Sequence, residues 1–363
     1  MMDFHPRFTI TPGISRALMR IEAVREAIEH LPISPAVLAA LRQTARLHST
    51  HYSTAIEGNR LTLEEVSAVL EKRVRLAGRV RDEREVLGYF AAMEQMEKWA
   101  AEKNAVTEEQ IQVLHALVMA GGRSTAKPSP YRGGQNVIRD SIHNAIVYLP
   151  PEAHDVPALM RDLMHWLQAP ETLALPAPIR AGVAHYQFAT IHPYYDGNGR
   201  TGRLLTTLLL HISRYDLKGI YALEEYYARD LARYYAALAI GPSHNYYMGR
   251  AKSDITPWVD YFCAGLAKSC EDVRRRAEEA ARAGETDHSA AMRTLDPRQR
   301  KALELFRASE QITSGDVQAL FGVSQRTARN ILTGWAAREF VMVANASKKG
   351  RRYVLAARYA PLL

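Results

Sequence analysis

The spacing of apolar side chains along the chain is mostly that of helices. Apolar residues recur every three or four positions, as on the buried face of an α-helix. Up to residue 191, this spacing predicts helices at 13–30, 35–56, 62–76, 82–101, 107–120, 152–168 and 177–191. A further helix begins after Gly197 and continues to about Tyr215, and two or three more helices are predicted within 222–283.

The helical period fails between Gly121 and Pro151. This segment is rich in Gly, Pro and Ser, and its β-branched pieces at 137–138 and 146–148 predict a short hairpin. The fold class that follows is mainly α, with a helical body and one small β element.

The C-terminal region has a different order of elements. Helices at 297–308, 313–321 and 324–339 precede strand-like runs at 340–344 and 353–356, which flank a basic turn. Three helices followed by a two-stranded ribbon resemble the winged helix-turn-helix family. That resemblance implies contact with DNA phosphates and base edges or, alternatively, a protein–protein module. The basic residues that would contact DNA are Arg326, Arg329, Lys348, Lys349, Arg351 and Arg352.

Charge is unevenly spread along the 363 residues. The net charge is +8, and from Arg293 onward the chain holds 13 Lys and Arg against 5 Asp and Glu, which leaves 34 of each before that point. A basic module therefore follows a neutral body, a distribution that favours a nucleic-acid contact at one end. The predicted domains are an N-terminal helical region at 1–100, a helical core at 101–283, a linker at 284–296 and the winged-helix-like region at 297–363.

Composition limits the class of protein. Apolar residues make up 47% and charged residues 24%, as in ordinary globular proteins, so disordered and collagen-like chains are excluded. Cys263 and Cys270 lie about 10 Å apart along a predicted helix, too far to bridge each other, and are interpreted as buried thiols of a reducing compartment. The longest apolar run, 204–212, is half of a membrane span, and 1–8 lacks the apolar core of a secretion signal. We expect a cytoplasmic protein without a membrane partner, and a homodimer as the usual soluble assembly.

The clearest chemistry lies at 192–203, which reads His-Pro-Tyr-Tyr-Asp-Gly-Asn-Gly-Arg-Thr-Gly-Arg. A glycine-containing loop enters a helix here, and the N–H groups at a helix start bind anions. Arg200 and Arg203 share one helix face and can fork onto phosphate oxygens. Asp196 is a hard oxygen ligand suited to magnesium shared with phosphates, and His192 can accept a proton near neutral pH. Together they predict a phosphoryl- or nucleotidyl-transfer site.

The same residues resemble the Fic family motif His-Pro-aromatic-x-Asp/Glu-Gly-Asn-Gly-Arg-x-x-Arg at every defining position, and the resemblance covers most of 1–280. It implies a protein adenylyltransferase that moves AMP from ATP to a Ser, Thr or Tyr hydroxyl of a target protein, which the sequence does not identify. His192 would deprotonate the hydroxyl, and Asp196 would hold Mg²⁺ at the α- and β-phosphates. His185, inside the preceding helix, is interpreted as structural. The residues that would bind the nucleotide are Gly197, Asn198, Gly199, Arg200, Thr201, Gly202 and Arg203.

The resemblance also implies roles outside this segment. The hairpin corresponds to a flap that pairs with the target backbone, with Ile138 and Val147 as side-chain clamps. Tyr234 and Tyr235 would pack on adenine, although ordinary core aromatics have the same spacing. Asp230 stands where the family often has Asn, and this change removes a hydrogen-bond donor from the nucleotide contact.

An upstream segment, Ser53-Thr54-Ala55-Ile56-Glu57-Gly58, resembles the inhibitory pattern Ser/Thr-x-x-x-Glu-Gly/Asn of Fic proteins. Ser53 and Glu57 are four residues apart and share one face at the end of a helix. The resemblance implies an inhibitory helix whose Glu57 pairs with Arg203 and occupies the place of a phosphate. Two alternatives stay open. One is a Fic enzyme that removes AMP or transfers phosphate or phosphocholine, and the other is a nucleotide-sensing, DNA-binding regulator.

Overall fold

The computed structural model describes residues 4–71, 75–123, 125–139, 146–241, 244–282, 294–345 and 351–362. The chain divides into two compact units, one of residues 1–32 and 38–278 and the other of residues 33–37 and 279–363. The larger unit carries the His192–Arg203 segment, so the fold of that unit determines the geometry of the site.

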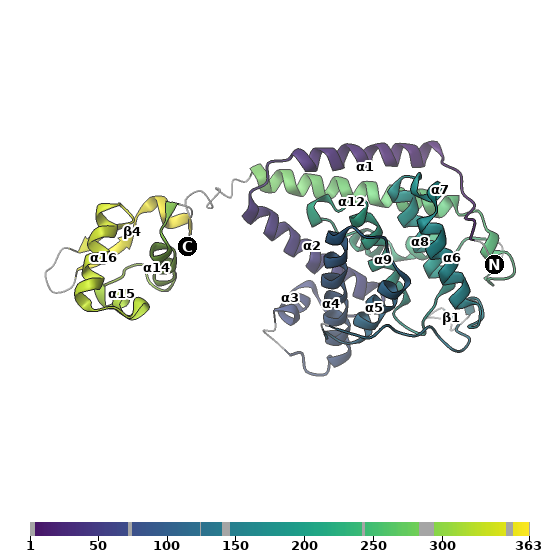
Figure 1. Cartoon of the computed structure of the whole chain (residues 1–363), viewed down its shortest axis with the longest axis horizontal. Helices are drawn as coiled ribbons and strands as arrows, with labels where there is room; N and C mark the ends of the chain where they lie inside the picture. The colour runs from purple at the N-terminus through teal and green to yellow at the C-terminus, as the bar shows by residue number, and fades with distance from the viewer. Residues whose placement is uncertain are drawn as a thin grey trace. The chain divides into compact units, whose positions relative to one another are not determined.

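The part of the chain before residue 283 is mainly helical, with one small sheet (Figure 1). Strands β1 (Ile138–Arg139) and β2 (Ile146–Tyr148) are antiparallel, as the predicted hairpin requires. The helices are α1 (Pro12–His30), α2 (Pro35–Ile56), α3 (Leu63–Leu70), α4 (Val80–Glu102), α5 (Glu108–Met119), α6 (Val156–Gln168), α7 (Pro170–Leu173), α8 (Ala177–Ile191), α9 (Asn198–Ile212), α10 (Glu224–Arg229), α11 (Leu231–Leu238) and α12 (Thr256–Arg282).

Helices α8 and α9 form the centre of the larger unit. Helix α8 is buried along nearly its whole length, and α9 packs against α8, α4 and α5. Gly182 lets α12 approach α8, because a Cβ there would meet the Phe262 ring at 2.7 Å. The indole of Trp258 donates a hydrogen bond to the Gly182 carbonyl at 2.7 Å. The loop between α8 and α9 is therefore fixed at both ends by buried helices.

The first and last helices of this unit lie side by side in Figure 1. Arg20 of α1 forms a bidentate pair with Glu271 of α12, at 2.7 and 2.6 Å. Thr11, which caps α1, also donates to Asp260 of α12 at 3.4 Å. Segments from the two ends of the neutral body are thus joined by polar contacts.

The end of α2 and the start of α3 follow local sequence signals. Gly58 has φ +91°, a left-handed conformation that glycine adopts without steric cost. Thr62 and Glu65 form a reciprocal capping box at the start of α3. The prediction that this helix continues to about residue 76 is wrong, because α3 ends at Leu70 and the Leu76 amide instead donates to the Glu83 carboxylate of α4.

Between residues 294 and 362, the described part of the smaller unit contains three α-helices and one strand pair, in the predicted order, followed by a 3-10 helix at Ala357–Leu362. Ile312 bonds to Tyr353 through backbone groups, so the segment before the second helix lies beside the last strand. Its core includes Phe306, Leu332, Trp335 and Phe340. The winged-helix assignment stays a prediction. The elements are α14 (Pro297–Ala308), α15 (Ser314–Phe321), α16 (Gln325–Ala337), β3 (Val341–Asn345) and β4 (Arg352–Leu355).

Two simpler expectations can also be compared with the structure. Cys263 and Cys270 are buried free thiols, and burial raises the pKa of each to about 12. Within the described ranges, no helix has both the length and the apolar character needed to cross a bilayer.

Candidate active site

His192 directly follows α8 in an unusual backbone conformation. It has φ 52° and ψ 59°, and its N–H bonds to the Phe188 carbonyl at 3.0 Å. A left-handed backbone is uncommon for a residue other than glycine, and such strain is often found at functional sites. Burial lowers the pKa of His192 to about 4. At neutral pH the imidazole is therefore uncharged and able to accept a proton.

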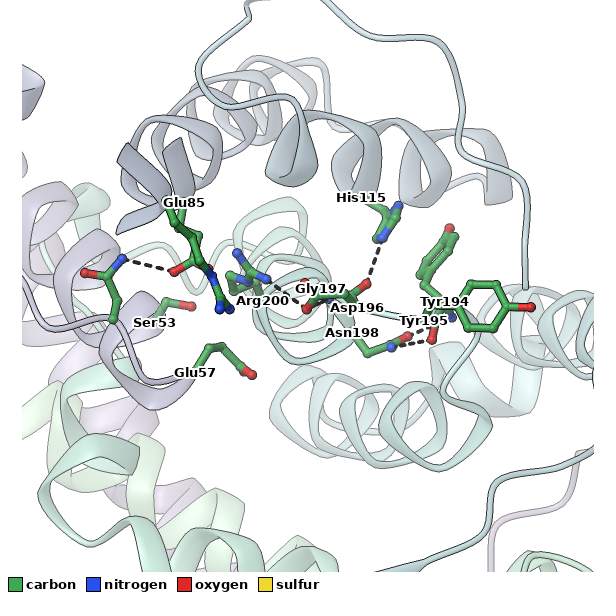
Figure 2. Close-up of polar contacts among 12 residues, drawn as sticks. Ser53, Glu57, Glu85, His115, Tyr194, Tyr195, Asp196, Gly197, Asn198 and Arg200 are labelled. Atoms are coloured by element: carbon green, nitrogen blue, oxygen red, sulfur yellow. Dashed lines mark hydrogen bonds and ion pairs between the residues drawn. The ribbon is translucent and has the colours of Figure 1, made fainter. Parts of the chain in front are cut away.

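The loop after His192 is held through its backbone. The Asn198 side chain accepts from the Tyr194 N–H at 2.9 Å and donates to the Tyr194 carbonyl at 2.7 Å (Figure 2). Asn136 donates to the same carbonyl at 3.2 Å. Arg132 is 3% exposed and donates from Nε to the His192 carbonyl at 2.9 Å. Asn198 therefore holds the loop with its side chain, and its predicted contact with the nucleotide stays a prediction.

His115 of α5 holds the backbone of the loop at Asp196. Its Nε2 lies 2.9 Å from the backbone carbonyl of Asp196, as Figure 2 shows. Its ring stacks on Tyr194, with centroids 3.6 Å apart and planes 9° apart. Burial lowers the pKa of His115, which favours a neutral ring that donates one hydrogen bond to this carbonyl.

The start of α9 has the features of an anion cradle. Gly197 caps the helix with φ 78°, and the Gly197 N–H donates to the Asp196 carboxylate at 2.6 Å. Arg200 Nη2 bonds to the same carboxylate oxygen at 3.1 Å, while the buried Arg200 Nε has no partner among the described residues. Thr201 and Gly202 are buried, and Gly202 faces the Phe188 ring. The free N–H groups and an unsatisfied guanidinium nitrogen suit phosphate oxygens.

Asp196 is the carboxylate available for a metal ion. Its side chain is 59% exposed, and only one of its oxygens takes part in the contacts described above. Among the described residues, no group of three or more His, Cys, Asp or Glu side chains could hold a metal by itself. This arrangement fits Mg²⁺ better than metals that need an all-protein site, because Mg²⁺ often binds one carboxylate together with phosphates and water.

The last arginine of the motif faces the end of α2. Arg203 donates from Nε to the Ser53 hydroxyl and from Nη2 to the Ser53 carbonyl, both at 2.8 Å. Nη2 also bonds to Glu57 at 2.9 Å. Burial acts to lower the pKa of Arg203, but the charge of Glu57 and nearby hydroxyls outweigh it, and the net shift is upward. The predicted pairing of Glu57 with Arg203 is present.

The Glu57 carboxylate also lies against the helix start. A Cβ on Gly199 would collide with Glu57 Oε1, so a larger residue at this position would require the Glu57 side chain to move. The Glu57 side chain is 30% exposed, whereas that of Arg203 is 1% exposed. A carboxylate of the chain itself therefore occupies the space in front of the N–H groups of α9.

The residues predicted to contact adenine lie in two different environments. Tyr234 is 2% exposed, stacks on Tyr227 and hydrogen-bonds through its hydroxyl to His185 at 3.0 Å. Tyr235 is 47% exposed, and its hydroxyl donates to the Ile56 carbonyl at the end of α2. Asp230 caps α11 by accepting from Arg233 N at 3.0 Å. Tyr234 thus has the contacts of a core aromatic, and the adenine role of Tyr235 stays a prediction.

His185 and the predicted flap can also be placed. His185 is 2% exposed and lies between Thr206 and Tyr234, and burial lowers its pKa to about 3, which confirms that it is part of the core. Ile138 is partly buried in β1, while Val147 of β2 is 39% exposed. Their action as clamps stays a prediction.

The basic residues of the smaller unit are only partly described. Arg326 and Arg329 are exposed on α16, and Arg351 and Arg352 are exposed at the start of β4. Lys348 and Lys349 lie outside the described residues. DNA contact stays a prediction.

Sequence reasoning missed His115, Arg132 and Asn136. Each holds a backbone carbonyl of the 192–196 loop from another part of the chain. Nothing in their local sequence distinguishes them from other polar residues, so only the folded chain reveals these contacts.

Comparisons with known proteins agree with this geometry. Residues 105–210 match the model of the Fic/DOC family. Proteins named protein adenylyltransferase Fic from Drosophila grimshawi and Drosophila virilis are both 32% identical over 196 residues, which is 54% of this chain and 39% of each relative. The chain thus spans well under half the length of these curated relatives.

Solved structures extend the likeness over more of the chain. A Fic family protein from Desulfovibrio desulfuricans is 27% identical with a TM-score of 0.64, over 98% of this chain and 99% of that one. A structure of Fic-1 from C. elegans is 25% identical with a TM-score of 0.59, over 75% and 74% of the two chains. The cradle at the start of α9 lies inside the matched segment, and the chain therefore carries a Fic/DOC family domain at residues 105–210.

Proposed function

We propose that the chain transfers AMP from ATP to a hydroxyl side chain of a target protein and that Glu57 inhibits this transfer. The observation that carries the proposal is the Glu57 carboxylate in contact with Arg203 at the start of α9. A cationic, helix-capped position that accepts a carboxylate suits a phosphate as well. The names of the relatives, protein adenylyltransferase Fic, support AMP as the transferred group.

The proton transfer is assigned to His192. The uncharged imidazole takes the proton of the target hydroxyl while the hydroxyl oxygen attacks the α-phosphorus. The bond from that phosphorus to the bridging oxygen breaks, and pyrophosphate leaves with the bonding electrons. Because burial keeps the pKa of His192 near 4, the imidazole is in its basic form at neutral pH.

The phosphates are assigned to the start of α9. N–H groups of this first turn and Arg200 would bind the α- and β-phosphates, and Arg203 would bind the terminal phosphate. Asp196 would hold Mg²⁺, which supplies charge neutralisation of the phosphates when bound. His115 keeps the backbone of Asp196 in place, at 2.9 Å from the carbonyl.

Inhibition follows from competition for one position. The Glu57 carboxylate and a terminal phosphate are both anions, and they repel strongly if both approach Arg203 in a partly dry site. ATP would then bind weakly or with its α-phosphate turned away from attack. Since the Glu57 side chain is 30% exposed and has one ion-pair partner among the described residues, its displacement requires little rearrangement of the core.

Transfer of labelled phosphate tests the proposal. Label is counted above the amount that a cell extract takes up by itself, because kinases in the extract transfer the γ-phosphate. Above that background, Glu57→Gly protein with Mg²⁺ should incorporate label into protein from ATP labelled at the α-phosphate and none from ATP labelled at the γ-phosphate. Glu57→Gly/His192→Ala is the matched control and should incorporate neither. Incorporation of label from the γ-phosphate alone would contradict AMP transfer and indicate that the protein transfers phosphate instead.

The AMP-removing alternative assigns Glu57 a different role, as a base that positions water. Its partly exposed carboxylate beside the cradle is compatible with that chemistry. The two roles separate in one measurement, because Glu57→Gly would increase transfer under the first and would abolish release of AMP from a modified protein under the second.

The smaller unit is proposed to contact DNA. The exposed arginines at 326, 329, 351 and 352 support this proposal, together with the excess of basic residues after Arg293. A gel-shift at two salt concentrations tests it, since phosphate contacts weaken as salt rises.

A further inference from the structure

The guanidinium of Arg203 is a buried charge whose ion-pair partner must leave when nucleotide binds, if the proposed function holds. Its side chain is 1% exposed, and Glu57 is the carboxylate within ion-pair distance among the described residues. A buried charge without a counter-charge is costly, and the cost is reduced only by other charges and hydrogen bonds. Something other than Glu57 must therefore balance Arg203 between the release of Glu57 and the arrival of a phosphate.

A second carboxyl group is buried in the same unit. Glu224, the first residue of α10, is 2% exposed. The described residues place no Lys, Arg or His nitrogen within 4.0 Å of its carboxyl oxygens. Its neighbour Glu225 is different, because Glu225 pairs with Arg229 and Arg276. Glu224 is thus a buried carboxyl group that has no direct ion pair with a described residue, and the charge of Arg203 acts on it.

Hydroxyl groups flank each of the two groups. Tyr89 of α4 is fully buried and donates to Glu224 Oε1 at 3.0 Å. The Tyr89 hydroxyl also lies 3.4 Å from the hydroxyl of Ser49 on α2. Ser53 follows one turn later on α2, and its hydroxyl accepts from Arg203 Nε at 2.8 Å. The hydroxyls of Tyr89, Ser49 and Ser53 are therefore polar groups that link the surroundings of the Glu224 carboxyl group with those of the guanidinium, by way of one turn of α2.

The electrostatics agree with this connection. Burial raises the pKa of Glu224, while its hydrogen bond from Tyr89 and the positive charge of Arg203 act in the opposite direction. Charges in a low-dielectric interior interact across intervening groups more strongly than in water.

We propose that Glu224, across the hydroxyls of Tyr89, Ser49 and Ser53, is the internal counter-charge of Arg203 and keeps this arginine in position when Glu57 leaves it. Arg203 would then be balanced by two carboxylates in the inhibited state, and by Glu224 and the terminal phosphate in the nucleotide-bound state. Glu224 is a positioning residue, since it acts on the nucleotide through Arg203.

A double-mutant cycle tests the coupling. Thermal unfolding is measured without nucleotide for the parent, Glu57→Gly, Glu224→Gln and the double variant. The double variant removes both counter-charges, so its loss of Tm should exceed the sum of the single losses by about 2–4 °C for each kcal/mol of coupling. Glu225→Gln is the matched control, because it changes the adjacent glutamate of the same helical turn. Its loss of Tm should simply add to the loss caused by Glu57→Gly.

Nucleotide provides the second measurement. In the double variant, the terminal phosphate of ATP supplies a missing counter-charge that ADP cannot place at Arg203. The Tm gain from ATP should therefore exceed the gain from ADP by more in the double variant than in Glu57→Gly alone. A merely structural role of Glu224 would lower Tm equally in both backgrounds and leave the difference between ATP and ADP unchanged.

The outcomes separate this inference from the proposed function. Additive Tm losses, with ATP still binding to Glu57→Gly, would overturn the role of Glu224 and leave AMP transfer standing. Failure of ATP to raise the Tm of Glu57→Gly would reject the proposed function itself. If Glu224→Gln does not fold, Tyr89→Phe removes the hydroxyl that donates to Glu224 and should show coupling to Glu57→Gly of the same sign and smaller size; no coupling in that variant would also overturn the inference.

Discussion

The 192–197 loop and the end of α2 both face the start of α9, but they are held in different ways. The loop is attached through its backbone, by side chains of Asn198, Asn136, His115 and Arg132 that come from three separate regions of the chain. The Glu57 carboxylate is attached through one ion pair and is 30% exposed. Hydrogen bonds to the backbone fix the positions of the loop residues, whereas a side chain held by a single ion pair can be displaced by a ligand. The difference supports the proposal that a rigid site is inhibited by a side chain that a ligand can displace.

The largest effect is expected from removing the proposed base of the rigid region. In the Glu57→Gly background, His192→Ala should reduce AMP incorporation by roughly 10²–10⁴-fold, because general-base catalysis contributes about that much. ATP binding should persist, since the α9 cradle and Arg200 are intact. Initial rates with ATP labelled at the α-phosphate, together with an ATP titration, check both parts. Incorporation at the Glu57→Gly rate would remove His192 from the chemistry.

The pH dependence sharpens this assignment. Burial lowers the pKa of His192 to about 4, so the imidazole stays unprotonated from neutral pH down to about 5. The transfer rate should be level over that range and fall as the pH drops through about 4. Rates measured in Glu57→Gly from pH 8 downward check this, with circular dichroism as a control for unfolding. A fall centred near pH 6.5 would mean that the base is not a buried histidine.

The removable region should give the next largest effect, in the opposite direction. Glu57→Gly should raise AMP incorporation by roughly 5–150-fold, the range of a 1–3 kcal/mol coupling. Glu57→Asp should gain less, because a shorter side chain still carries the charge. Arg203→Ala should not gain, since it removes the phosphate ligand together with the inhibitor's partner. Initial rates at saturating ATP compare the variants, and an unchanged rate in folded Glu57→Gly would reject autoinhibition.

The attachment of the loop predicts a stability effect. Asn198→Ala should lower the free energy of unfolding by about 1–3 kcal/mol, because it leaves the buried N–H of Tyr194 without its partner and the Tyr194 carbonyl with Asn136 alone. Asn136→Ala is the matched control and should cost less, since Asn136 is only partly buried and bonds at 3.2 Å. Urea unfolding measures both. Equal losses would mean that burial of the amide does not determine the rigidity of the loop.

The smallest effect on the site is expected from the smaller unit. Replacing Arg326, Arg329, Arg351 and Arg352 with glutamine should leave AMP incorporation unchanged while it weakens DNA binding. The slope of the logarithm of the binding constant against the logarithm of the salt concentration should decrease in magnitude by about one unit for each phosphate contact removed. Fluorescence anisotropy at several salt concentrations is the measurement. Binding that does not depend on salt would assign this unit to a protein partner.

Much of the fold was predictable because its signals are local. Capping boxes mark where α3 and α5 start, and a glycine with positive φ marks the end of α2. Apolar residues spaced by about 3.6 positions determine which face of a helix is buried. The α3 prediction ran too far because the apolar residues Val74 and Leu76 continue the helical pattern, whereas Leu76 is bonded to the start of α4. A contact with a later helix cannot be read from periodicity.

The candidate site also combines features that local sequence predicts with contacts between distant segments. The 192–203 segment and the Ser53–Glu57 pair were recognisable from the sequence by itself, because each puts its chemical groups within one loop or one helical turn. Only the tertiary structure showed that the Asn198 side chain bonds to the Tyr194 backbone and that Tyr234 is buried against His185. It also showed that His115 and Arg132 support the loop and that Glu224 accepts a hydrogen bond from Tyr89. The physical reason is distance along the chain. Hydrogen bonds within a turn are encoded by spacing, whereas the burial and pairing of charges from α2, α4, α9 and α10 exist only after these helices pack.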